Sequence, residues 1–172
     1  MLEIRKLSPF GAEILGVDLR DELSAEDKKR ILEAWYREGV VVFRQEGLTE
    51  PDLDRIARVF GQPSYAGIAD KTEAGHRQYI SNVERHTSNV PDGELKFHMG
   101  YSFDEHPLRC TMLYGFEVPP PGSGGDTLFA NAKLAYDRLP PALREKVNKL
   151  KIVHTKPQDV NYWWAHPINF PH

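Results

Sequence analysis

Apolar positions in the first 61 residues alternate between the spacing of strands and that of helices. Short alternating or β-branched runs predict a strand at 40–43, and a strand or strand-like turn at 12–14 and at 17–19. Elsewhere apolar residues recur every three or four positions, which predicts two amphipathic helices packed against a sheet. The helical stripes consist of Ile31, Leu32, Trp35 and Tyr36 in the first helix and Leu53, Ile56, Ala57 and Phe60 in the second.

Residues that cap helices stand at the ends of both stripes. Ser24 precedes the first stripe with Asp27 three positions later, and Thr49 precedes the second with Asp52 in the same relation. A hydroxyl at the N-cap and an acidic residue three positions on satisfy N–H groups that the first helical turn leaves unpaired. A glycine follows each stripe, and Gly39 is expected to end the first helix in a left-handed conformation.

The pattern from residue 97 onward predicts more strands and two short helices. Residues 109–118 alternate like a strand, and 97–103 and 109–116 are expected to be adjacent antiparallel strands. Residues 151–154 are expected to form another strand. Asn131 is expected to cap one helix, and a further helix follows two prolines. The polar stretch at 62–96, with scattered Gly, Pro, Asn and Asp, fits a binding loop or an ordinary surface connection.

Composition narrows the partners that this chain of 172 residues can have. Apolar residues make up 40%, charged residues 27%, and the net charge is −3 with both signs mixed, so no basic surface for nucleic acid is expected. Cys110 is the one cysteine, which excludes an internal disulfide, and its apolar surroundings predict a buried strand residue rather than a reactive thiol. No apolar signal region or membrane-length segment occurs, so we expect a cytoplasmic protein without a membrane partner.

His98 lies in a segment that has part of the pattern of an iron site. A mononuclear iron site that activates oxygen commonly uses two histidines and one carboxylate. On a strand, positions i and i+2 point the same way, so His-x-Asp would present two ligands side by side, but Gly100 stands at that second position. Taken alone, one histidine in an apolar strand is more often a hydrogen-bonded core residue than a ligand.

A set of motifs in fixed order extends over nearly the whole chain. They are Gly11-Ala12-Glu13-Ile14, Val17-Asp18-Leu19, Gly39-Val40-Val41-Val42-Phe43-Arg44, the segment around His98, and Gly124-Gly125-Asp126-Thr127-Leu128-Phe129-Ala130-Asn131. Together these motifs resemble the N-terminal portion of the taurine dioxygenase (TauD/TfdA) family of Fe(II)- and 2-oxoglutarate-dependent dioxygenases. The last motif is the most specific of them.

The resemblance implies a fold, a cofactor and two site residues. The fold would be mainly β with flanking helices, a double-stranded β-helix (jelly roll) in a single domain over 1–172 whose C-terminal strands are missing. His98 matches the family's proximal iron ligand, and Thr127 matches the threonine that holds a carboxylate of the cosubstrate 2-oxoglutarate. Position 100 is an aspartate in the family. The distal histidine and the arginine that pairs with 2-oxoglutarate lie beyond residue 172.

The resemblance favours an oxidoreductase of the dioxygenase or hydroxylase type that acts on a small organic acid, and it assigns no further catalytic residue. Two alternatives stay open because of Gly100. One is a halogenase-like site, in which the vacant coordination position accepts halide, and the other is an inactive, truncated jelly roll that only binds. Because open sheet edges pair with other chains, a homo-oligomer is also expected.

Overall fold

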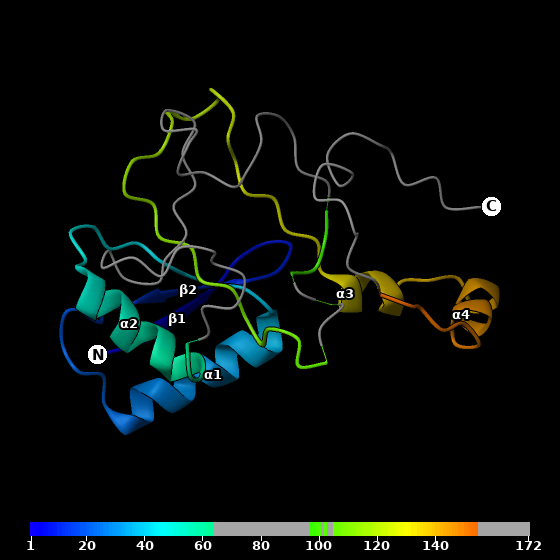
Figure 1. The fold of residues 1–172 in the computed structure, drawn as a ribbon, viewed down its shortest axis with the longest axis horizontal. Helices are drawn as coiled ribbons and strands as arrows, with labels where there is room; N and C mark the ends of the chain where they lie inside the picture. The colour runs from blue at the N-terminus through cyan, green and yellow to red at the C-terminus, as the bar shows by residue number, and fades with distance from the viewer. Residues whose placement is uncertain (64–96, 101, 103–104, 155–172) are drawn as a thin grey trace. The chain divides into compact units, whose positions relative to one another are not determined.

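The computed structural model describes residues 1–63, 97–100, 102 and 105–154. The chain, drawn as a ribbon in Figure 1, divides into two compact units by its internal contacts. The first unit comprises Met1–Ser64 and Arg109–Pro140, and the second comprises Tyr65–Leu108 and Pro141–His172.

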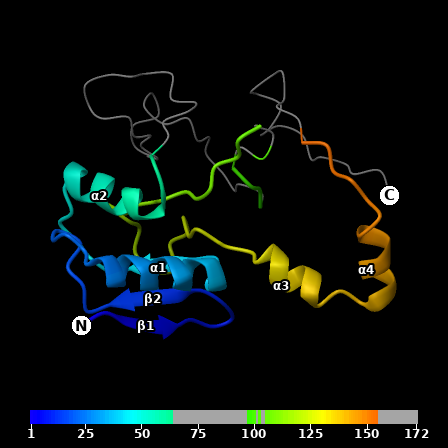
Figure 2. The same ribbon diagram turned by 90° about the horizontal axis from the view of Figure 1, so that it is seen from below.

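The first unit contains a sheet of three short strands in the order β1-β2-β3. β1 (Glu3–Lys6) runs antiparallel to β2 (Ala12–Leu15), and β2 runs parallel to β3 (Val41–Phe43). A parallel pair needs a crossover connection, which α1 (Ala25–Glu38) provides. Figure 2 shows α1 lying along the sheet. The strand predicted at 40–43 is thus confirmed, 12–14 is a strand, and 17–19 forms the turn after β2.

The predicted caps fix where α1 begins and ends. The Ser24 hydroxyl accepts a hydrogen bond from the Asp27 N–H at 3.0 Å and donates one to the Asp27 carboxylate at 2.8 Å. Gly39 ends the helix with a φ of 79°, a left-handed conformation that glycine adopts without a steric penalty. Both predictions are confirmed.

The cap of α2 (Glu50–Phe60) uses the same pair of residue types in a different way. The N–H and the hydroxyl of Thr49 both donate to the Asp52 carboxylate, at 2.8 and 2.5 Å. The pKa of Asp52 is lowered to about 2. The bond from the Thr49 hydroxyl is the largest cause, followed by the bond from the Thr49 N–H and then by a bond from Arg55. Arg55 also donates to the carbonyls of Leu19 and Arg20, so α2 is attached to the turn that follows β2.

The core of the first unit is built by the sheet and the first two helices. Its buried apolar residues are Leu2, Ala12, Ile14, Leu19, Leu23, Ile31, Ala34, Leu48, Leu53, Ile56 and Phe60. Trp35 is partly buried and meets Phe60 edge to face, with ring centroids 5.5 Å apart. Tyr36, predicted in the same stripe, is 60% exposed. Most residues of the two predicted helical stripes therefore belong to the core or pack against it.

Two short helices follow in the second half of the chain. α3 (Ala132–Asp137) begins at Asn131, whose side chain accepts from the Leu134 N–H at 2.8 Å, as predicted. α4 (Pro141–Val147) begins at the second of the two prolines, which is its first residue. No helix in the described ranges has the length and apolar character needed to cross a membrane.

The strands predicted after residue 96 are not formed in the part of the chain that the structure describes. Residues 97–100 and 102 are irregular or turn, 109–118 has no assigned strand, and 151–154 is irregular. An alternating pattern forms a strand only where a second strand supplies backbone partners, and the described residues provide none here. Among the described residues, more lie in helices than in strands. The mainly β composition expected from the sequence is therefore not observed there.

Replacing Ser24 with Ala should lower the free energy of unfolding by about 1 kcal/mol, because the first turn of α1 loses the acceptor for its Asp27 N–H. Ser24→Thr keeps a hydroxyl and should lose much less. Urea denaturation followed by far-UV circular dichroism measures both. Equal losses for Ala and Thr would contradict the capping role.

Candidate functional site

The segment that contains the predicted cosubstrate residue starts with contacts to the core of the first unit. The Arg109 guanidinium carbon lies 5.9 Å from the Trp35 ring centroid and 5.3 Å from that of Tyr36, within cation–π range. Cys110 and Tyr114 pack against the core. The Tyr114 hydroxyl oxygen accepts a hydrogen bond from the Leu48 N–H at 3.0 Å. These contacts attach 109–114 to α1 and to the residue before the α2 cap.

Cys110 behaves as the sequence predicts in burial but not in secondary structure. Its side chain is partly buried against the core, and this burial raises the pKa of the thiol, which favours the protonated form. It lies in no strand, however. The packing role of Cys110 therefore does not depend on a sheet.

A tight turn connects this segment to the motif that contains Thr127. The N–H and the hydroxyl of Ser123 both donate to the Pro120 carbonyl, at 3.1 and 2.7 Å. Gly125 has a φ of 83°, and a Cβ atom there would lie 3.3 Å from Pro119 Cγ. Glycine is needed at this position for both its backbone conformation and the close approach of Pro119.

Thr127 lies just after this turn, in the first unit, and is exposed. Four residues later, Asn131 caps α3, and its side-chain nitrogen lies 4.0 Å from where a Cβ of Gly39 would be. The motif thus ends beside the C-terminal end of α1. A threonine hydroxyl exposed in this way is available to donate to a carboxylate.

His98 belongs to the second unit and is exposed in an irregular segment, with Gly100 in a turn. Glycine offers no side-chain ligand at that position. Within the described residues, no group of three or more histidine, cysteine, aspartate or glutamate side chains is arranged to hold a metal ion. These residues alone therefore do not make up an iron site of two histidines and a carboxylate.

Sequence reasoning did not find the charged cluster around Glu13. This residue lies in the central strand and is only 2% exposed. It accepts hydrogen bonds from Arg5 and from Arg44, the latter at 2.9 Å. The bond from Arg5 is the main cause that lowers the pKa of Glu13, against the opposing effect of burial. The sequence did contain a signal for this cluster. Glu13 lies between the core positions Ala12 and Ile14, and each neighbouring strand has an arginine within it or directly after it.

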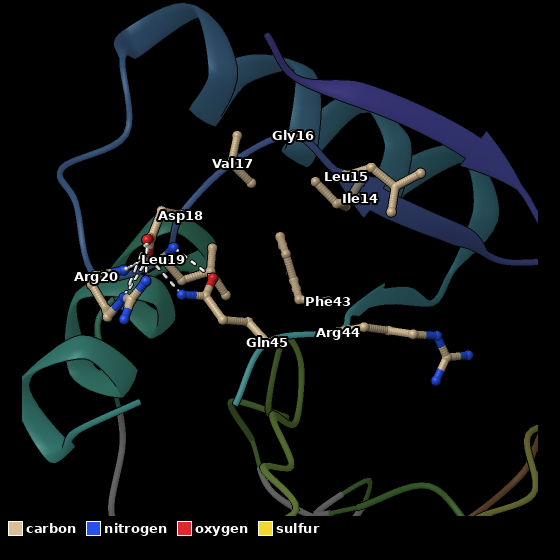
Figure 3. Close-up of a pocket in the computed structure, with 10 residues that line it drawn as sticks. All are labelled: Ile14, Leu15, Gly16, Val17, Asp18, Leu19, Arg20, Phe43, Arg44 and Gln45. Carbon is tan, nitrogen blue, oxygen red and sulfur yellow. Dashed lines mark hydrogen bonds and ion pairs between the residues drawn. The ribbon is translucent and has the colours of Figure 1, made fainter. Parts of the chain in front are cut away.

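A hollow of about 260 Å³ adjoins this cluster at the end of β2 (Figure 3). Its polar side chains pair with one another. Asp18 accepts hydrogen bonds from the Arg20 guanidinium, at 2.5 to 3.1 Å, and from Gln45 at 2.5 Å, while Gln45 accepts from the Leu19 N–H. Figure 3 shows Arg44 directed away from this group. These hydrogen bonds form a clamp that holds the turn after β2. The hollow therefore has a structural role rather than a reactive one.

The family of the chain follows from a match to a sequence model described as "Taurine catabolism dioxygenase TauD, TfdA family", which covers residues 3–172. The chain belongs to this family.

Curated relatives of this TauD/TfdA chain include dioxygenases from several bacteria. An alpha-ketoglutarate-dependent sulfate ester dioxygenase of Pseudomonas putida is 31% identical over 154 residues, which cover 87% of this chain and 48% of the relative. An alpha-ketoglutarate-dependent 2,4-dichlorophenoxyacetate dioxygenase of Cupriavidus pinatubonensis is 28% identical, covering 84% and 55%. The TauD/TfdA chain spans about half the length of the curated relatives it matches.

Solved structures support the same fold for this TauD/TfdA chain. The crystal structure of a taurine dioxygenase from Burkholderia xenovorans matches with a TM-score of 0.59 and 23% identity over 86% of this chain and 51% of the other. A second structure from that organism matches with a TM-score of 0.62 and 26% identity over 87% and 52%. The TauD/TfdA chain therefore shares the fold of these structures over the matched part.

The acid stability of this TauD/TfdA chain should depend on Asp18. The Arg20 side chain, followed by the Arg20 N–H and Gln45, lowers the pKa of Asp18 below its ordinary value of 3.8. Because the folded state then binds the proton less readily than the unfolded state, this carboxylate stabilises the fold above pH 4. The stabilisation is lost as the pH falls through the lowered pKa.

Asp18→Asn should therefore lower the melting temperature at pH 6 and flatten its decline between pH 4 and pH 2. Asp21→Asn is the matched control, since the Asp21 carboxylate accepts no hydrogen bond from the described residues. Differential scanning fluorimetry across this pH range measures the effect. An unchanged acid slope in Asp18→Asn would show that the clamp does not contribute.

Proposed function

We propose that this chain forms part of an Fe(II)- and 2-oxoglutarate-dependent dioxygenase that oxidises a small organic substrate. The observation that carries the proposal is the family match over residues 3–172, which includes the turn and motif around Thr127. The similar proteins whose names are given above are alpha-ketoglutarate-dependent dioxygenases. Their names favour a dioxygenase over a halogenase-like site or an inactive scaffold.

The fold proposed for the complete domain is the jelly roll. The matches to taurine dioxygenase structures support it. In such a fold, 97–103 and 109–118 would become strands once partner strands supply hydrogen bonds to their backbones. A single domain that includes all of 1–172 is part of the same proposal.

Thr127 is the residue proposed to bind 2-oxoglutarate. Its hydroxyl would donate a hydrogen bond to one carboxylate of the cosubstrate, and such charge-assisted bonds are stronger than neutral ones. The turn at Ser123 and the cap at Asn131 fix the backbone on either side of Thr127. Exposure of Thr127 leaves the hydroxyl open to a ligand.

His98 is proposed as an iron ligand, with Gly100 as a departure from the family pattern. When bound, Fe(II) supplies the oxygen chemistry of this enzyme class. An imidazole provides one neutral ligand, which cannot hold a divalent ion firmly by itself. A complete site of three ligands would need at least one ligand from outside the described residues, because they hold no such group of three.

The substrate proposed is a small organic acid or ester, the class to which sulfate esters and dichlorophenoxyacetate belong. A homo-oligomer is also proposed. It is supported by the exposed apolar side chains of the first unit at Leu113, Phe116, Val118 and Leu128. A cytoplasmic location stays a prediction from the sequence.

Replacing Thr127 with Val should weaken the binding of 2-oxoglutarate about 10- to 100-fold, the range expected when a hydrogen bond to a charged group is lost. Thr127→Ser keeps the hydroxyl and should bind nearly as well as the parent. Isothermal titration calorimetry with 2-oxoglutarate and Mn(II) under anaerobic conditions measures both. Binding that is equally strong in Thr127→Val would remove this residue from the site.

Replacing Gly100 with Asp should raise the affinity for Fe(II) at least tenfold, because a negatively charged oxygen ligand is added two positions from His98. The gain should disappear in Gly100→Asp combined with His98→Ala. Gly100→Ala is the matched control, since it adds a side chain without a ligand. Anaerobic iron titration with a colorimetric chelator as competitor measures the series. A gain that survives the loss of His98 would make His98 a structural residue.

A further inference from the structure

We infer that Tyr114 is a positioning residue for Thr127, through contacts that hold residues 109–131 against the first two helices. The functional meaning of this inference rests on the proposed role of Thr127 in binding 2-oxoglutarate. The contacts themselves do not depend on that role. All of the residues involved belong to the first unit.

The backbone around Thr127 has no ladder to hold it in the part of the chain that the structure describes. Residues 109–118 and 124–131 form no strand there. A segment outside a sheet loses its position through backbone motion unless side chains or turns constrain it, because ordering each residue costs conformational entropy. Within the described residues, the position of Thr127 therefore depends on contacts made before and after it.

The contact before Thr127 is the hydrogen bond between Leu48 and Tyr114. Leu48 is 8% exposed, and its N–H donates to the Tyr114 hydroxyl oxygen at 3.0 Å. A buried N–H without a partner is costly. The Tyr114 hydroxyl therefore stabilises the chain just before the α2 cap by pairing with the Leu48 N–H. The ring of Tyr114 also meets Phe116 edge to face, with centroids 4.8 Å apart. Tyr114 therefore joins the segment to the helical core by a directional bond as well as by packing.

The contacts after Tyr114 carry this constraint toward Thr127. The close approach of Gly125 to Pro119, together with the Ser123 bonds to Pro120, holds the turn between them. Beyond Thr127, the side chain of Asn131 lies beside the end of α1. Thr127 thus lies in a span whose first end is joined to the residues before α2 by the Tyr114 hydrogen bond, and whose second end, the cap of α3 at Asn131, lies near the C-terminal end of α1.

Tyr114→Phe is the variant that tests this inference, because it removes the hydroxyl and keeps the ring that packs against the core. Tyr36→Phe is the matched control. It removes a hydroxyl from a 60% exposed tyrosine of the same unit and keeps the ring beneath Arg109. The readout is the backbone order parameter of residues 127–131, measured by nitrogen-15 relaxation on the intact chain.

In the parent and in Tyr36→Phe, the order parameters at 127–131 should be close to the value of about 0.85 for rigid backbone. In Tyr114→Phe they should fall below about 0.6, while those of β2 stay unchanged. Low values in the parent, unchanged values in Tyr114→Phe, or an equal fall in β2 would each overturn the inference.

A titration of the same samples with 2-oxoglutarate separates the inference from the proposed function. The Thr127 amide signal should shift in the parent, and the dissociation constant should rise about fivefold or more in Tyr114→Phe, as for the loss of a net hydrogen bond. If the parent signal does not shift, the proposed role of Thr127 fails. The order parameters still decide whether Tyr114 positions this segment.

Discussion

The buried carboxylate of Glu13 is the constraint on which the sheet, and through it the first unit, depends. Glu13 pairs directly with Arg5 in the register of β1 and β2, and Arg44 follows β3 two residues after Val42, the partner of Glu13 in the parallel pair. A buried charge without partners costs several kcal/mol, on the order of an unpaired ion in a protein interior. A slip of one residue in either pairing would turn an arginine to the opposite face. The cluster therefore specifies both registers.

The sheet fixed in this way supports the helices, and the helices support the region around Thr127. α1 connects the parallel strands, and its Trp35 and Tyr36 rings receive Arg109. Leu48, the residue before the α2 cap, donates its N–H to the Tyr114 hydroxyl. The part of the chain that resembles a cosubstrate site is thus attached to structure that was built from the first 60 residues.

The sequence predicted those elements whose causes are local. Ser24 with Asp27 and Gly39 define α1 through bonds within a few residues of each other, and a pattern of residue types suffices to find them. β1 escaped prediction because Glu3–Lys6 has one apolar residue and becomes a strand only through its pairing with β2. For the opposite reason, 109–118 has a strand pattern but no partner among the described residues. Thr127 and His98 came from resemblance, since neither geometry nor charge in the sequence marks them.

The bond between Leu48 and Tyr114 joins residues 66 positions apart, so it closes a long loop. The entropic cost of closing a flexible loop grows only with the logarithm of its length, by roughly 0.6 kcal/mol for each doubling. The entropic part of this closure therefore depends only weakly on the number of residues between the two points. Length changes in the part of the span outside α2 would add little entropic cost, while the two ends remain joined.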